Sequence, residues 1–170
     1  FLEPDMSLLF RSVALSLLLA SLPLAAAPVA TPLLHGQFLP ADDLQLRSEV
    51  PEQQQLMLVT SYSVVVGSQR QSNQQPIPVT SPLVLRLKGK PLSKGATITQ
   101  VLLSFDGEGG KSLKKPSYDG ASHTLSLYYP LSAYPQLLDL LRNGPVYCQF
   151  LSYPNGHIWA DLHSGAVRVR

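Results

Sequence analysis

The chain has 170 residues, a formal net charge of +2 and a single cysteine, Cys148. This length is enough for one domain with its own core but not comfortably for two. A lone cysteine excludes an internal disulfide, and its apolar neighbours Val146 and Phe150 predict a buried thiol.

Residues 6–27 have the three parts of a secretory signal peptide. A short start carries Arg11, an apolar stretch follows at 13–22, and small residues close the segment in PLAAAPVA. We therefore expect export, with cleavage somewhere within residues 25–30.

Residues 1–5 contain two acids, which do not suit the positive start of such a signal, so they are interpreted as sequence upstream of a true start at Met6. The apolar stretch is shorter than the ~20 residues that span a bilayer. Pro23 also interrupts it, so we expect no transmembrane segment in the mature chain. No asparagine is followed by the Ser or Thr of a glycosylation signal, which favours the bacterial periplasm or exterior over a eukaryotic secretory route.

Residues 31–170 are predicted to form a single β-rich domain, because apolar residues alternate with polar ones along much of the chain. In PLVLRLKG, for example, Leu83, Leu85 and Leu87 fall on one face and Arg86 and Lys88 on the other. Four strands are expected, at 56–67, 82–89, 96–105 and 123–129. The predicted fold is mostly β, an antiparallel sandwich or a partly open barrel.

A long polar loop is predicted at 67–82, because GSQRQSNQQPIPVTSP has no apolar periodicity. The region after it is rich in cations, and two interpretations stay open. It can be a patch for an anionic envelope polymer or lipid headgroup, or simply a set of solvated side chains at strand ends and turns. The cations are Arg86, Lys88, Lys90, Lys94, Lys111, Lys114 and Lys115.

One short helix is expected in YPQLLDLLRNGP, just before the final strands. Pro135 suits a first helical position, four leucines form an apolar stripe, and Asn143 and Gly144 end the helix. About two turns cannot stand alone in water, so this helix must pack on a sheet.

The final segment, VYCQFLSYPNGHIWADLH, predicts a β-hairpin. Pro154, Asn155 and Gly156 fit a three-residue loop with glycine in the left-handed position. This loop pairs Leu151 with Trp159, and so places the apolar groups on one face, the predicted core face. That face carries Val146, Cys148, Phe150, Ile158, Ala160 and Leu162.

The opposite face of the hairpin combines aromatic rings with hydrogen-bonding groups, which is the chemistry that sugar rings and extended polar ligands need. We therefore predict a ligand surface here. The alternative is that the short helix or the N-terminal segment simply covers it. The candidate residues are Tyr147, Gln149, Tyr153, His157, Trp159, Asp161 and His163.

Catalytic and metal sites are less well supported. His157 and His163 are six strand residues apart, roughly 20 Å at ~3.3 Å per residue, so they cannot share a metal ion. Asp161 with His163, or His163 with His35 or His123, stay open as metal pairs, but no H-x-x-x-H spacing or cysteine pair supports them. No G-x-S-x-G motif marks a nucleophile, and GGKS at 109–112 lacks the first glycine of a phosphate-binding loop. No catalytic residue, metal or cofactor is therefore assigned.

The sequence thus predicts an exported, non-catalytic binding or accessory protein of the cell envelope, whose partner is a glycan, a peptide or another protein. The alternative is a small periplasmic hydrolase that uses His163 and Asp161. Nucleic acid is not an expected partner, because an exported protein without a recognisable binding motif has little access to it.

Overall fold

The structure is a computed structural model, and it describes residues 33–68, 73, 82–106 and 113–165. The predicted signal peptide and its cleavage region, most of the polar loop at 67–82, and Lys111 lie outside the described residues.

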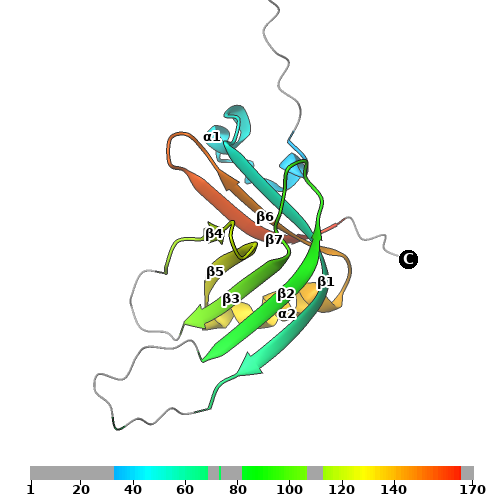
Figure 1. Cartoon of the computed structure of the whole chain (residues 1–170), viewed down its shortest axis with the longest axis vertical. Helices are drawn as coiled ribbons and strands as arrows, with labels where there is room; N and C mark the ends of the chain where they lie inside the picture. The colour runs from blue at the N-terminus through cyan, green and yellow to red at the C-terminus, as the bar shows by residue number, and fades with distance from the viewer. Residues whose placement is uncertain (1–32, 69–72, 74–81, 107–112, 166–170) are drawn as a thin grey trace, which may run out of the picture. The chain divides into compact units, whose positions relative to one another are not determined.

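Seven strands form one curled sheet in the order β4-β5-β3-β2-β1-β6-β7 (Figure 1). Neighbouring strands run antiparallel except β3 and β5, which are parallel. The prediction of a mostly β fold is confirmed, and the partly open barrel is the alternative found. The strands are β1 (Gln53–Val66), β2 (Leu83–Pro91), β3 (Gln100–Asp106), β4 (Ser117–Asp119), β5 (Thr124–Pro130), β6 (Val146–Ser152) and β7 (Ile158–Ser164).

The helical elements are short. Before the sheet come the 3-10 turn η1 (Gly36–Phe38) and α1 (Leu44–Ser48), and between β5 and β6 come η2 (Leu131–Ala133) and α2 (Tyr134–Arg142). Helix α2 is the predicted helix before the final hairpin, with a proline in its first turn as expected. No helix in the described ranges is long and apolar enough to cross a membrane.

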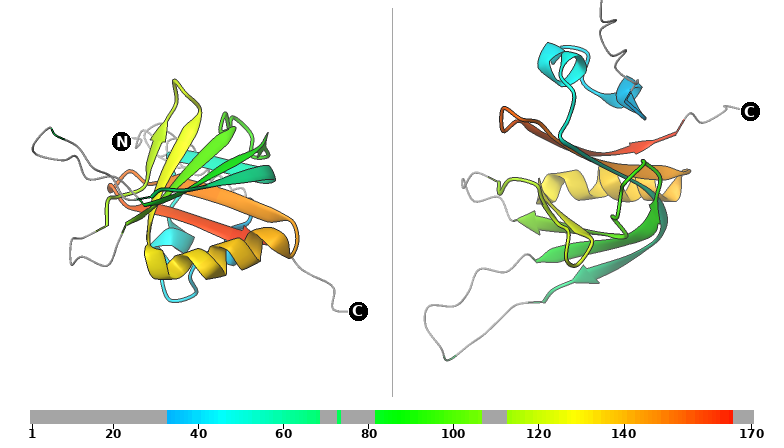
Figure 2. Two further views of the ribbon diagram at one scale, coloured as in Figure 1. Left: turned by 90° about the horizontal axis from the view of Figure 1, so that it is seen from below. Right: turned by 45° about the horizontal axis from the view of Figure 1, so that its top comes forward.

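The main core fills the concave side of the curled sheet, where α2 packs (Figure 2). Alternate residues of the strands point into it, as the period-two pattern predicts, and α2 adds Leu137. The ring of Tyr134 meets Phe105 edge to face, with centroids 5.5 Å apart. A helix of nine residues is thus stabilised by the sheet beneath it.

The predicted strand at 96–105 begins later than expected, at Gln100. The N–H groups of Thr97 and Ile98 donate to the side-chain oxygen of Gln55, at 2.9 and 3.0 Å. Because these two donors are satisfied by an amide side chain, the chain there does not need a neighbouring strand.

Strand β1 has two unlike halves. Residues 53–58 pair with β6, and of these Met57 and Leu58 also pair with β2, whereas residues 61–66 pair with β2 alone. The register shifts between Val59 and Ser61, where β1 carries a bulge. Opposite this point the backbones approach so closely that a Cβ added at Gly89 would lie 2.2 Å from the carbonyl oxygen of Leu58.

The hairpin of β6 and β7 has the predicted register, with Leu151 opposite Trp159 and Gln149 opposite Asp161. Gly156 has φ 82°, the left-handed conformation that the three-residue loop requires. On the predicted core face Val146, Cys148 and Phe150 are buried and Ala160 and Leu162 are partly buried, whereas Ile158 is 37% exposed. Ile158 is the first residue of β7 and lies beyond the reach of the concave core.

Candidate functional site

The predicted ligand residues share one surface, which we call the hairpin face: Tyr147, Gln149, Tyr153, His157, Trp159, Asp161 and His163. The structure places this face on the convex side of the sheet, away from the main core. The N-terminal segment, residues 33–49 with η1 and α1, lies over it.

Near the hairpin loop the covering is tight. Tyr153 is only 3% exposed, and its hydroxyl donates to the carbonyl oxygen of Leu46 at 3.0 Å. Tyr153 packs with Leu39, Leu46 and Leu151 in a small second core, and Trp159 borders the same cluster. Burial is the main cause that raises the pKa of the Tyr153 hydroxyl.

Asp43 and Glu49 tie α1 to the hairpin loop through side chains. Asp43 caps α1 by accepting the N–H of Gln45 and Leu46, and its other oxygen lies 3.6 Å from Nε2 of His157. The side-chain amide of Asn155 donates to Glu49 at 3.0 Å. The N-terminal segment is therefore held by polar contacts as well as by apolar packing.

At the other end of the hairpin face, four side chains form a hydrogen-bonded chain. Nδ1 of His35 lies 2.7 Å from Nε2 of His163, and Nδ1 of His163 lies 2.5 Å from Oδ1 of Asp161. The indole N–H of Trp159 donates to the second carboxylate oxygen of Asp161. Three of these residues were predicted to share one face, whereas His35, far away along the chain, was named only as a possible metal partner of His163.

The tautomers of the two imidazoles follow from the carboxylate at one end of these hydrogen bonds. The carboxylate of Asp161 only accepts, so His163 donates through Nδ1; when His163 is neutral, its Nε2 accepts from Nδ1–H of His35. Burial, followed by the neighbouring imidazole of His163, lowers the pKa of His35 below its usual value. Nε2 of His35 then carries the free lone pair at the end of the chain.

Aromatic rings surround the two imidazoles. The ring of Phe38 stacks on His163 with centroids 4.2 Å apart, and Tyr147 meets His35 edge to face at 4.6 Å. His35 has a left-handed backbone, with φ 61° and ψ 19°, which is uncommon for a residue other than glycine. In the described part of the chain, no serine, threonine or cysteine hydrogen-bonds to either imidazole.

Gln149 lies at the centre of the hairpin face and is fully buried, with 0% exposure. Neither atom of its side-chain amide has a hydrogen-bond partner among the described residues. The hairpin face is therefore not an open platform: Gln149 and Tyr153 are buried, and the other five residues are only partly accessible, namely Tyr147, His157, Trp159, Asp161 and His163.

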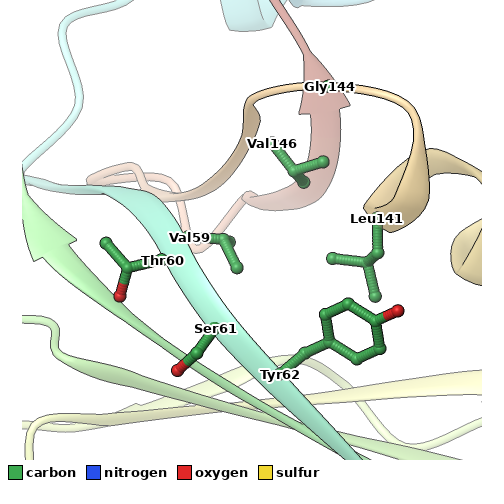
Figure 3. A pocket seen from close by; sticks show the side chains of 7 residues that line it. All are labelled: Val59, Thr60, Ser61, Tyr62, Leu141, Gly144 and Val146. Atoms are coloured by element: carbon green, nitrogen blue, oxygen red, sulfur yellow. The ribbon is translucent and has the colours of Figure 1, made fainter.

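A second candidate site, which we call the β1 groove, was not predicted. It has a volume of about 410 Å³ and lies between the bulge of β1, the end of α2 and the start of β6. In Figure 3 the side chains of Val59, Tyr62, Leu141 and Val146 turn toward one space, while Thr60 and Ser61 turn away from it. The groove is lined by Val59, Thr60, Ser61, Tyr62, Leu141, Gly144 and Val146.

The apolar surface of the groove continues along the second half of β1. Tyr62 and Val64 lie opposite Leu87 and Leu85, so they belong to the concave face, yet they are 39% and 37% exposed. A strand of 14 residues beside a β6 of seven leaves this surface open. The sequence signal was the length of the apolar run in LMLVTSYSVVVG, which exceeds every other predicted strand.

The predicted basic zone is only partly brought together. Arg86 and Lys88 lie side by side on the exposed convex face of β2. Lys90 follows at the end of β2, Lys94 lies in the next connection, and Lys114 stands over the ring of Tyr128, 5.5 Å from its centroid.

Comparison with known protein families, with curated proteins and with solved structures finds no match for the chain. Among the residues that the structure describes, no group of three His, Cys, Asp or Glu side chains could hold a metal ion.

Proposed function

We propose that this chain is an exported, non-catalytic binding protein of the cell envelope, and that it takes a glycan, peptide or protein partner in the β1 groove. The observation that carries the proposal is the open half of β1. Its concave residues Tyr62 and Val64 belong to the same face as the main core, but they are 39% and 37% exposed because β6 stops pairing with β1 at Leu58.

Exposed apolar side chains beside unpaired strand edges are unusual, because they invite association with other chains. The groove also adds α2 as a second wall through Leu141. Among the described residues that line it there is no carboxylate, imidazole or thiol. The groove therefore offers shape, apolar contact and backbone hydrogen bonds rather than acid–base chemistry, which supports binding over catalysis.

A role for the hairpin face in binding stays a prediction. It requires the N-terminal segment to move, because Gln149 and Tyr153 are buried beneath it. Export also stays a proposal that rests on residues 6–30. N-terminal sequencing of protein recovered from cells should begin between Ala26 and Thr31, and a chain that still begins near Met6 would remove the claim.

The binding proposal is tested with a matched pair of variants. Leu141→Glu places a charge in the groove, whereas Leu131→Glu alters a leucine that is 39% exposed outside the groove lining. Immobilised wild-type protein and Leu131→Glu should retain the same component of a bacterial envelope extract, and Leu141→Glu should lose it. Circular dichroism checks that both variants are folded. Equal retention by all three proteins would contradict the proposal.

The hydrogen-bonded chain from Trp159 to His35 favours a second candidate function, a small hydrolase. Asp161 orients His163, and His35 extends the chain to a lone pair that can take a proton from water or a substrate hydroxyl. His163→Ala should then lower turnover of an ester, glycoside or peptide substrate by about 100-fold or more. If His163→Ala leaves both binding and any turnover unchanged, the hydrolase is excluded.

A further inference from the structure

We propose that the partner of the β1 groove is an extended peptide that adds a strand to the free edge of β1, and that its residues alternate between apolar and acidic. This inference rests on the proposed function and specifies the partner.

The backbone of β1 offers a free edge from Thr60 to Val66. On its other side Thr60 lies in the bulge, residues 61–66 are all paired with β2, and the ladder ends where the N–H of Gly67 donates to Pro82 at 2.7 Å. Backbone groups of a strand point alternately to its two edges, so half of those in this stretch point away from β2. Within the described ranges no other strand pairs with that edge.

The chain itself does not continue the sheet here. β6 pairs with β1 only as far as Leu58 and Tyr147, and Pro145 precedes β6. Proline has no N–H to donate to a ladder, and the carbonyl of Pro145 already accepts from Gly165 at 3.1 Å. A bound peptide would therefore meet the edge without displacing a strand.

The concave side of the edge selects apolar residues. A strand added beside β1 would point every second side chain toward Tyr62, Val64 and Leu141. These contacts fill the groove that is now open. Main-chain hydrogen bonds with alternate side chains in a pocket are how edge-binding domains recognise peptides.

The convex side selects acidic residues. Ser61 lies directly opposite Lys88, and Ser63 lies directly opposite Arg86. Two strand spacings, about 10 Å, separate β2 from an added strand, and long cationic side chains span much of that gap. The small serines leave the path open, so two successive convex-facing carboxylates of the peptide can meet the two cations.

A second copy of this chain is a poorer occupant of the edge. Its residues 60–66, TSYSVVV, contain no acid, so two β1 edges pairing together would leave Arg86 and Lys88 without an anion. The charge argument therefore favours a different polypeptide over self-association.

The test uses two capped eight-residue peptides with a fluorescent label, one alternating valine with glutamate and the other valine with lysine. Fluorescence polarisation against the wild-type chain should show the glutamate peptide binding about three- to thirtyfold more tightly, as two exposed ion pairs allow. The double variant Arg86→Glu with Lys88→Glu should reverse this preference. Lys94→Glu, outside the edge, should leave it unchanged.

Two further measurements do not depend on variants. Methylation of alternate peptide nitrogens should abolish binding, because it removes the hydrogen bonds to β1. Added salt should weaken the glutamate peptide more than the lysine peptide. The inference is overturned if the two peptides bind equally, if methylation has no effect, or if sedimentation shows a dimer that Val64→Lys dissociates.

The failure of the inference and the failure of the proposed function are distinguishable. If neither peptide binds but Leu141→Glu still releases the envelope partner, the peptide inference is wrong and the groove remains a binding site. If neither peptide binds and no partner depends on Leu141, both proposals are wrong.

Discussion

Two buried glutamines in neighbouring strands should respond to the same substitution with opposite signs. Gln149 is fully buried and its side-chain amide has no partner among the described residues. Gln55 is also buried, but its oxygen accepts the N–H groups of Thr97 and Ile98. We therefore compare Gln149→Leu with Gln55→Leu, which have nearly the same volume change.

The expected magnitudes follow from these contacts. An unpaired buried polar group costs about 1 to 3 kcal/mol, so Gln149→Leu should raise the free energy of unfolding by about 1 to 2 kcal/mol. Gln55→Leu removes one hydrogen bond at Thr97, about 1 kcal/mol, and leaves the N–H of fully buried Ile98 unpaired, about 1 to 3 kcal/mol more. It should therefore lower the free energy of unfolding by about 2 to 4 kcal/mol.

Guanidinium unfolding followed by circular dichroism measures both changes, provided that the slope with denaturant concentration stays constant. A loss of more than about 1 kcal/mol in Gln149→Leu would refute the reasoning, because it would mean that the amide of Gln149 makes stabilising hydrogen bonds. The same holds if Gln55→Leu costs no more than Gln149→Leu.

Three other predictions address the bulge, the imidazoles and the thiol. Gly89→Ala should destabilise the fold by about 1 to 3 kcal/mol, since its Cβ would meet a backbone oxygen that cannot easily move, whereas Gly120→Ala, with open space around it, should be nearly neutral; equal effects in denaturant titrations would contradict the close approach. Because the pKa of His35 is lowered in the folded state, the unfolded chain takes up this proton at a higher pH than the folded chain does as the pH falls. The contribution of neutral His35 to the free energy of unfolding is therefore present above about pH 6.5 and is lost as pH falls through the folded-state pKa. His35→Asn keeps a residue tolerant of the left-handed backbone, so it should remove this part of the acid sensitivity of the melting temperature, and an unchanged pH profile would argue against it. Burial raises the pKa of Cys148 and shields it, so a thiol reagent should react only after denaturation, and rapid reaction of the native protein would show that the core there opens.

The parts of the fold that local signals encode were predictable. The loop Pro154 to Gly156 sets the register of the final hairpin by itself, because only a three-residue loop sorts the apolar side chains to one face. Pro135 and the leucines after it likewise define α2. In both cases the deciding residues lie within a few positions of one another.

The rest depended on contacts between distant residues. A period of two shows that β3 and β5 are strands but not that they pair in parallel. The alternation of apolar and polar residues in a strand does not identify the strand with which it pairs. Coverage of the hairpin face was an open alternative, and the specific contact of His35 with His163 had no local signal. The only sequence signal for the β1 groove was the length of its strand. That length leaves part of β1 uncovered because β6 stops pairing with it at Tyr147.

The position of β1 also has a consequence for how the chain folds. This strand is flanked by β2, which follows it, and by β6, which comes almost last. Loop closure over so many residues is slow compared with the formation of nearby hairpins. We therefore expect β1 and β2 to associate early, and the arrival of α2, β6 and β7 to limit the rate. During this interval the whole edge of β1 that faces away from β2 is unpaired. In the folded chain β6 pairs with the first half of this edge, and the stretch from Thr60 to Val66 stays unpaired, as in the folding intermediate.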